Sequence, residues 1–175
     1  MSMVTLVLGG CRSGKSSHAL ALAEAIPNGK KLFLATSVPT DGEMEKRVEK
    51  HRNERGREWT TIEVPVDLPG CILSHQGLHP PTVMVVDCLT LWVSNLMFHG
   101  FDEKGISNMT DRLRDALNNS SSPIFLVSNE VGTGVVPENK LARQFRDFAG
   151  YVNQRVAAKA HRVIYMVAGI PWVIK

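Results

Sequence analysis

Close to its N-terminus the chain reads Gly9-Gly10-Cys11-Arg12-Ser13-Gly14-Lys15-Ser16. Gly9 and Gly14 enclose four residues, and Lys15 and Ser16 follow directly, which matches the pattern GxxxxGK[ST] of phosphate-binding loops. We therefore expect every residue from 9 to 16 to contact the phosphates of a nucleoside triphosphate. The alternative is a glycine-rich turn that binds no ligand.

The sequence on either side of this loop agrees with a strand–loop–helix unit. An apolar run, Val4–Leu8, precedes the loop, and a helical pattern over Lys15–Ile26 follows it. The glycines allow backbone N–H groups to turn toward phosphate oxygens, and the helix N-terminus adds partial positive charge. In this arrangement we expect Lys15 to neutralise the β and γ phosphates and the Ser16 hydroxyl to bind Mg²⁺.

A second apolar run, Val83–Asp87, consists of four apolar residues followed by a carboxylate. We predict that Asp87 is the other protein ligand of Mg²⁺, directly or through water. The alternative is that Asp87 caps the helix that begins near Cys88 and Leu89.

Short apolar runs alternate with longer amphipathic segments along the whole chain, which predicts an α/β fold. Because most of the runs lack polar alternation, we expect strands buried on both faces of a mostly parallel, doubly wound sheet. This is the P-loop NTPase type of fold (RecA-like), here as a single domain over residues 1–175. The predicted strands are Val4–Leu8, Lys31–Ala35, Thr60–Val64, Val83–Asp87, Ile124–Ser128 and Val163–Ala168, with a possible edge strand at Trp172–Ile174. The predicted helices are Lys15–Ile26, Asp41–Arg55, Thr90–Phe98, Ser107–Asn118 and Glu138–His161, the last burying Leu141, Phe145, Phe148, Val152 and Val156.

Composition argues against several classes of protein. The formal net charge of +3 is far from that of a dedicated nucleic-acid-binding protein, so we expect no nucleic-acid partner. No apolar run approaches the ~20 residues needed to span a bilayer, and the N-terminus lacks the basic region of a signal peptide. The three cysteines form no CxxC pair, which favours free thiols in a reducing compartment. We expect a cytoplasmic protein.

One histidine lies on the apolar side of a predicted helix. Thr40 and Glu43 fit a capping box at the start of the segment Asp41–Arg55. Met44 and His51 then fall on the same helix face, and arginines able to neutralise phosphates lie nearby. From the residues alone, a packed core histidine remains an alternative to a functional one.

Several segments together resemble one family over nearly the whole chain. These segments are Gly9–Ser16, Ala35-Thr36-Ser37, Glu43-Met44 with Arg47, His51, Trp59, Ser128–Asn139, Arg143–Asp147, Gly150 and Asn153-Gln154. They resemble the bifunctional adenosylcobinamide kinase / adenosylcobinamide-phosphate guanylyltransferase of cobalamin biosynthesis. The segment Asn129–Asp147, with its pattern NEVGxGxVPxxxxxRxFRD, is far more specific than the phosphate loop.

The resemblance implies two reactions on one corrinoid. A nucleoside triphosphate, ATP or GTP, first phosphorylates the aminopropanol hydroxyl of adenosylcobinamide. GTP then guanylylates a histidine, and adenosylcobinamide phosphate displaces GMP from it to give adenosylcobinamide-GDP. By position, His51 corresponds to that histidine, and an imidazole is suited to the role as both nucleophile and leaving group.

The resemblance also implies further nucleotide contacts, at Ala35, Thr36, Ser37, Arg52, Asn53, Glu54, Arg55, Glu63 and Asp87. Among them, Glu63 is suited to recognise guanine, because a carboxylate can accept from both N1–H and the exocyclic amine. Adenine has no such pair of donors. The alternative is an edge-strand glutamate that faces water.

Other features leave alternatives open. Asn129 and Glu130 end a predicted strand where α/β sheets bind ligands, and they could orient substrate or metal. The glycine-containing loop after them could close over the site or pack against another subunit, and a homo-oligomer is expected. Arg143 and Arg146 could contact phosphate or a partner chain, or form surface ion pairs with Glu138 or Asp147.

The sequence departs from the family pattern at two positions. Asp87 stands where glutamate is common, and Lys50 stands where some members have a second histidine.

Two rival functions share the phosphate loop. A simple small-molecule kinase would not use His51, and a nucleotide-dependent switch would act through a partner.

Overall fold

The computed structural model describes residues 3–27, 29–38, 56, 58–76 and 82–175. The helix predicted over Asp41–Arg55 lies outside these residues, as do His51 and the predicted contacts at Arg52, Asn53, Glu54 and Arg55.

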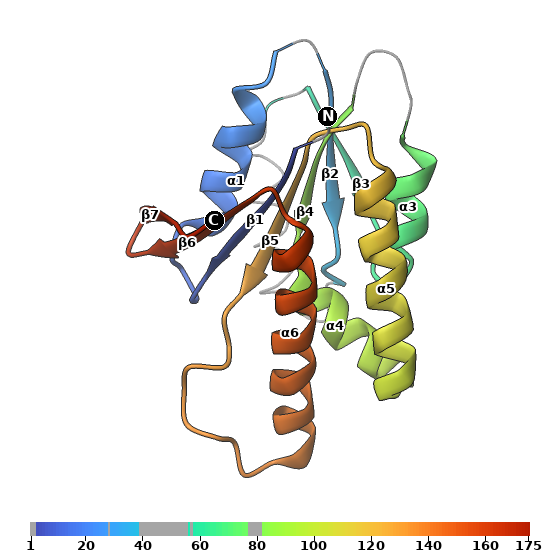
Figure 1. Ribbon diagram of the computed structural model, residues 1–175, viewed down its shortest axis with the longest axis vertical. Coiled ribbons are helices and arrows are strands. Elements are labelled where there is room, and N and C mark those ends of the chain that lie inside the picture. Colours follow the sequence, from blue (N-terminus) through green and yellow to red (C-terminus); the bar gives the residue numbers. More distant parts are fainter. Residues whose placement is uncertain (1–2, 28, 39–55, 57, 77–81) are drawn as a thin grey trace.

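The described chain is built around one seven-stranded sheet with the order β3-β2-β4-β5-β1-β6-β7 (Figure 1). The strands are β1 (Val4–Gly9), β2 (Lys30–Ala35), β3 (Trp59–Glu63), β4 (Thr82–Asp87), β5 (Ile124–Asn129), β6 (Arg162–Val167) and β7 (Ile170–Val173). All neighbouring pairs are parallel except β6 and β7, which are antiparallel. The mostly parallel sheet and its C-terminal edge strand are therefore confirmed, although the edge strand begins at Ile170, earlier than predicted.

Helices cover both faces of the sheet, as a doubly wound fold requires (Figure 1). They are α1 (Lys15–Glu24), α3 (Leu68–Ser74), α4 (Leu89–Phe98), α5 (Glu103–Asn119) and α6 (Lys140–Lys159). Helix α1 packs on one face, where Ala19 and Ala23 join the buried cluster around Val7, Val85 and Val127. The other helices cover the opposite face, where the second cluster includes Leu68, Trp92, Leu113 and Val152.

Two helix starts escaped prediction because side-chain caps, not apolar periodicity, define them. Helix α3 is a short helix that the sequence pattern did not predict; Asp67 caps it by accepting a hydrogen bond from Gly70 N at 3.2 Å. Helix α5 begins at Glu103, earlier than predicted, because Asp102 accepts from Gly105 N at 2.8 Å ahead of a polar first turn. The prediction that Leu141 is buried was wrong: it lies in the first turn of α6, beyond the edge of the core, and is 57% exposed.

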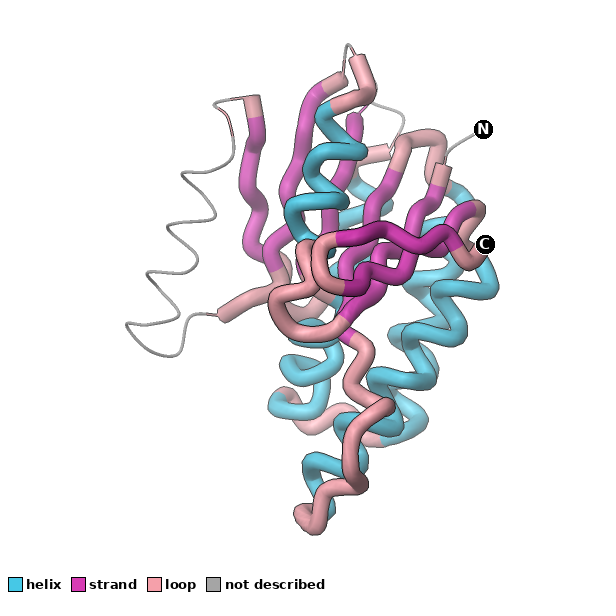
Figure 2. The backbone as a smooth tube through the Cα atoms, turned by 90° about the vertical axis from the view of Figure 1, so that its left-hand side faces the viewer, coloured by secondary structure: helices cyan, strands magenta, loops and turns pink. Residues whose placement is uncertain are grey.

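The connection from β5 to α6 extends away from the sheet before the helix turns back along it (Figures 1 and 2). Within the part of the chain that the structure describes, no helix has the length and apolar character needed to span a bilayer.

Candidate functional site

The phosphate loop connects the end of β1 to the start of α1, as the sequence pattern predicted. Gly14 is the N-cap of α1 and has a left-handed backbone with φ of 88°, which favours glycine. Arg12 at the tip of the loop also has a positive φ, of 55°. Lys15 Nζ donates to Gly10 O at 2.9 Å, so the lysine side chain folds back over the loop. The first turn of α1 contains no acidic residue, so its partial positive charge is not neutralised from within the helix.

Close packing at the base of the loop requires glycine at position 9. A Cβ atom there would lie 2.5 Å from Ser13 Oγ and 2.8 Å from Met166 O. The turn between β6 and β7 supports the loop from the same side, because Gly169 N donates to Ser13 O at 3.0 Å. The sequence pattern gave no sign of the contact from Gly169, since these residues are far apart in the chain. Cys11 and Arg12 lie at the exposed tip.

Three predicted site residues lie in one row across the sheet. Glu63 is opposite Ala35, Ala35 is opposite Asp87, and Asp87 is opposite Val127 on β5. Ala35 and Val127 belong to the cluster under α1, so alternation along the strands places the row on the face that α1 covers. The loop and Asp87 are not on adjacent strands, because β5 lies between β1 and β4.

The donor set on this face fits Mg²⁺. Ser16 and Asp87 would supply a hydroxyl and a carboxylate oxygen, and Mg²⁺ in nucleotide sites takes most of its other ligands from phosphate and water. No group of three or more His, Cys, Asp or Glu side chains gathers as a metal centre among the described residues. A metal site with two protein ligands, completed by the phosphates of a bound nucleotide, agrees both with the two oxygen donors and with the lack of a larger ligand group among the described residues.

Thr36 supports the site from within and does not project into it. Its side chain is fully buried, donates to Cys88 O at 2.7 Å and accepts from Cys88 N at 2.8 Å. Asn95 on α4 donates to Thr36 O at 2.7 Å. Ala35 is also buried, whereas Ser37 is half-buried and is the member of this segment with an accessible side chain.

Cys88 follows Asp87 but is unsuited to nucleophilic chemistry. Burial, together with the neighbouring Asp87 carboxylate, raises the pKa of the Cys88 thiol to about 11. The thiol therefore stays protonated at neutral pH. Burial, together with the positive charge of Arg162, lowers the pKa of His18 on α1, which favours its neutral form.

Glu63 ends the edge strand β3 and is exposed. This exposure agrees with a glutamate that faces water and equally with a carboxylate that is accessible to the guanine of a bound nucleotide. The role of Glu63 in recognising guanine therefore stays a prediction.

The end of β5 is tied to the phosphate loop. Glu130 N donates to Gly9 O at 3.1 Å, and the Glu130 carboxylate accepts from Gly132 N at 2.6 Å within its own turn. Arg143 Nη1 donates to the carbonyls of Pro137 and Glu138, so this arginine braces the loop before α6. Arg146 Nη1 is buried without a hydrogen-bond partner among the described residues.

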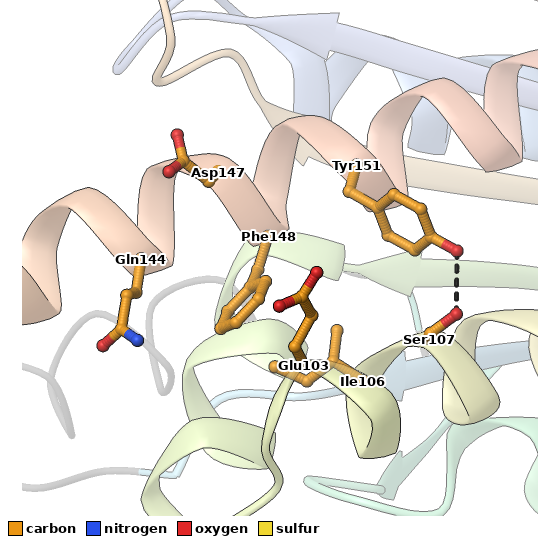
Figure 3. Close-up of a pocket in the computed structure, with 7 residues that line it drawn as sticks. All are labelled: Glu103, Ile106, Ser107, Gln144, Asp147, Phe148 and Tyr151. Carbon is orange, nitrogen blue, oxygen red and sulfur yellow. Dashed lines mark hydrogen bonds between the residues drawn. The ribbon is translucent and has the colours of Figure 1, made fainter.

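A cavity of about 310 Å³ lies between α5 and α6 (Figure 3). Phe148 on α6 points toward Glu103 and Ile106 on α5, and Tyr151 Oη is 2.9 Å from Ser107 Oγ. All of its lining residues come from these two helices, so it shares none with the phosphate loop.

Comparison with known proteins identifies a family model and full-length relatives that match this chain. The family model described as cobinamide kinase / cobinamide phosphate guanyltransferase matches residues 5–174. The bifunctional adenosylcobalamin biosynthesis protein CobU of Escherichia coli (strain K12) is 41% identical over 99% of this chain and 100% of its own length. The bifunctional adenosylcobalamin biosynthesis protein CobP of Pseudomonas aeruginosa is 39% identical over 99% of this chain and 98% of its own length.

Solved structures with low sequence identity share the fold. The flagellar accessory protein FlaH of Methanocaldococcus jannaschii aligns with a TM-score of 0.56 at 12% identity, covering 99% of this chain and 78% of that one. A protein of Pyrococcus horikoshii OT3 aligns with a TM-score of 0.61 at 10% identity, covering 99% and 86%.

Proposed function

Since this chain belongs to the cobinamide kinase / cobinamide phosphate guanyltransferase family, we propose that it phosphorylates adenosylcobinamide and then converts the product to adenosylcobinamide-GDP. The observation that carries the proposal is the near-complete match to bifunctional relatives at about 40% identity, in a chain that keeps the phosphate loop.

In the kinase reaction, the aminopropanol oxygen forms a bond to the γ-phosphorus of ATP or GTP. The bond from that phosphorus to the β–γ bridging oxygen breaks, the nucleoside diphosphate leaves, and the hydroxyl proton is released. Lys15 and the backbone N–H groups of the loop stabilise the charge that develops on the phosphate oxygens. Ser16 and Asp87 would hold Mg²⁺ together with the nucleotide, and the ion would supply further neutralisation of this charge.

In the guanylyl transfer, the neutral imidazole of His51 attacks the α-phosphorus of GTP and pyrophosphate leaves. An oxygen of adenosylcobinamide phosphate then attacks the same phosphorus, and the histidine leaves, which restores the free imidazole. Two easier displacements thus replace one difficult one. The role of His51 rests on the sequence resemblance and on imidazole chemistry, since His51 lies outside the described residues.

The guanine is recognised by Glu63, and the nucleotide is also contacted by Ser37 and by residues 52–55, whereas the buried Ala35 and Thr36 support this part of the site from within. Copies of the chain associate, and the apolar side chains available for such an interface include Phe98 and Val135, which are 82% and 95% exposed. We place the protein in the cytoplasm, in a reducing environment that suits its three free cysteines.

A single substitution tests the shared phosphate site. Purified protein is incubated with Mg²⁺, ATP, GTP and adenosylcobinamide, and the phosphorylated and GDP-bearing corrinoids are separated and quantified. Lys15→Ala should lower the rate of both reactions by about 100-fold or more, because each needs phosphate charge neutralised. Lys30→Ala, which removes an exposed lysine at the opposite end of a strand, should leave both rates unchanged. Retention of either activity in Lys15→Ala would contradict a shared site, and a wild-type protein that stops at the phosphorylated corrinoid would indicate a simple kinase.

A further inference from the structure

Two buried polar side chains, Thr90 and Asn153, form hydrogen bonds with the backbone of Asn129 at the end of β5, and a third, Ser128, contacts Thr90. Asn129 N donates to Thr90 Oγ1 at 2.7 Å, and Thr90 Oγ1 lies 3.2 Å from Ser128 Oγ. From the other side, Asn153 Nδ2 donates to Asn129 O at 3.1 Å. Thr90, Ser128 and Asn153 are 5%, 1% and 6% exposed, so none of them is available to a ligand in solution. Thr90 and Asn153 therefore fix the backbone of Asn129, and Ser128 supports the Thr90 hydroxyl.

This backbone unit is continuous with the phosphate loop and with the strand that carries Asp87. Asn129 is the register partner of Gly9, and the next residue, Glu130, donates to Gly9 O. Thr90 lies in the first turn of α4, which begins directly after Asp87 and Cys88. Hydrogen bonds thus connect the ends of β4, β5 and β1 into one edge.

Alternation along β5 places the Asn129 side chain on the face of the sheet that α1 covers. Val127 belongs to the cluster under α1, and Ser128 turns to the opposite face, where it meets Thr90 of α4. The side chain of Asn129 therefore returns to the α1 face, beside the start of the phosphate loop and beyond the row that contains Asp87. An amide there can donate two hydrogen bonds to phosphate oxygens.

We propose that the Asn129 amide donates a hydrogen bond to the phosphoryl group under transfer, and that Thr90 and Asn153 are positioning residues that hold Asn129 for this contact. The inference rests on the proposed kinase function. A hydrogen-bond donor that is already in position needs no reorganisation when charge develops on the phosphoryl group. The hydrogen bonds that hold the Asn129 backbone should therefore raise the rate of phosphoryl transfer.

The test is a double-mutant cycle on phosphorylation of adenosylcobinamide. Asn129→Ala should lower kcat by about 100-fold with little change in KM for the nucleotide, because the contact strengthens only as charge develops. Thr90→Val, which keeps the side-chain shape, should lower kcat by about tenfold, and Thr90→Ser should restore most of it. In the Asn129→Ala background, Thr90→Val should have no further effect on kcat.

Thr110→Val is the matched control, since Thr110 is also a buried threonine but bonds to Ile106 O within its own helix α5. It should leave kcat unchanged. The proposal is overturned if Thr90→Val lowers kcat by the same factor with and without Asn129, or lowers only the melting temperature. If the wild-type protein does not phosphorylate the corrinoid, the proposed function fails. The same set of Asn129 and Thr90 variants is then compared by the rate at which each hydrolyses the nucleotide with water as the acceptor.

Discussion

Glu63 shows how one residue would make the site selective for guanine. It ends an edge strand, lies in the same row as Asp87 and has Ala35 as its neighbour on β2. A carboxylate at this position can accept from both hydrogen-bond donors of a guanine edge, whereas a glutamine side chain would oppose a donor with a donor.

Glu63→Gln should therefore weaken GTP binding by about tenfold or more and change ATP binding by less than about twofold, with Kd for each nucleotide measured by calorimetry. Glu58→Gln, which alters an exposed glutamate just before β3, is the control and should leave both affinities unchanged. An equal loss for GTP and ATP would remove Glu63 as the guanine reader.

Single residues were predictable where the local pattern determines them. The phosphate loop was found because its glycines are needed by the backbone itself, as the left-handed Gly14 and the tight contact at Gly9 show. Gly169, Thr90 and Asn153 were not assigned a role, because each acts on a residue distant in sequence. A single sequence contains no signal for such long-range partners.

At the scale of elements, the ends of β2 and β4 are held together by one threonine. Thr36 Oγ1 accepts from the N–H of the buried Cys88 and donates to its C=O, which also accepts from Trp92 N in α4.

Thr36→Val should lower the free energy of unfolding by about 2 kcal/mol, because it leaves the buried Cys88 N–H unpaired, whereas Cys88 O keeps the hydrogen bond from Trp92 N. Thr36→Ser keeps the hydroxyl and should lose less than about 1 kcal/mol, as measured by urea unfolding of both variants. Similar stabilities for the two variants would show that the hydrogen bonds with Cys88 contribute little.

Elements were predictable in proportion to their apolar content. The central strands β1, β4 and β5 are largely apolar and buried, and their bounds agree closely with the prediction, whereas the exposed edge strand β7 begins two residues earlier than predicted. The short helix α3 and the polar first turn of α5 lacked that signal, and their starts depend on Asp67 and Asp102 as caps.

At the scale of the whole molecule, alternating strands and helices were sufficient to predict the doubly wound sheet. The order of the strands was not predicted, although it determines the site: β5 lies between β1 and β4 and brings Asn129 next to the phosphate loop. Strand order depends on how crossover connections pack, and this is a property of the assembled sheet.

The molecule as a whole is proposed to carry out two transfers with one phosphate loop, and the second distinguishes it from a plain kinase. A covalent intermediate at His51 would explain how one chain performs both reactions.

The most direct test is to incubate the protein with Mg²⁺ and GTP labelled at the α-phosphate, then denature it and treat part of the sample with acid. We expect label that stays on the denatured wild-type chain, is released by acid as expected for a phosphorus–nitrogen bond, and is absent from His51→Ala. His51→Ala should still phosphorylate adenosylcobinamide, which shows that it is folded. An unlabelled wild-type chain that nevertheless binds GTP, or equal labelling of His51→Ala, would contradict the account.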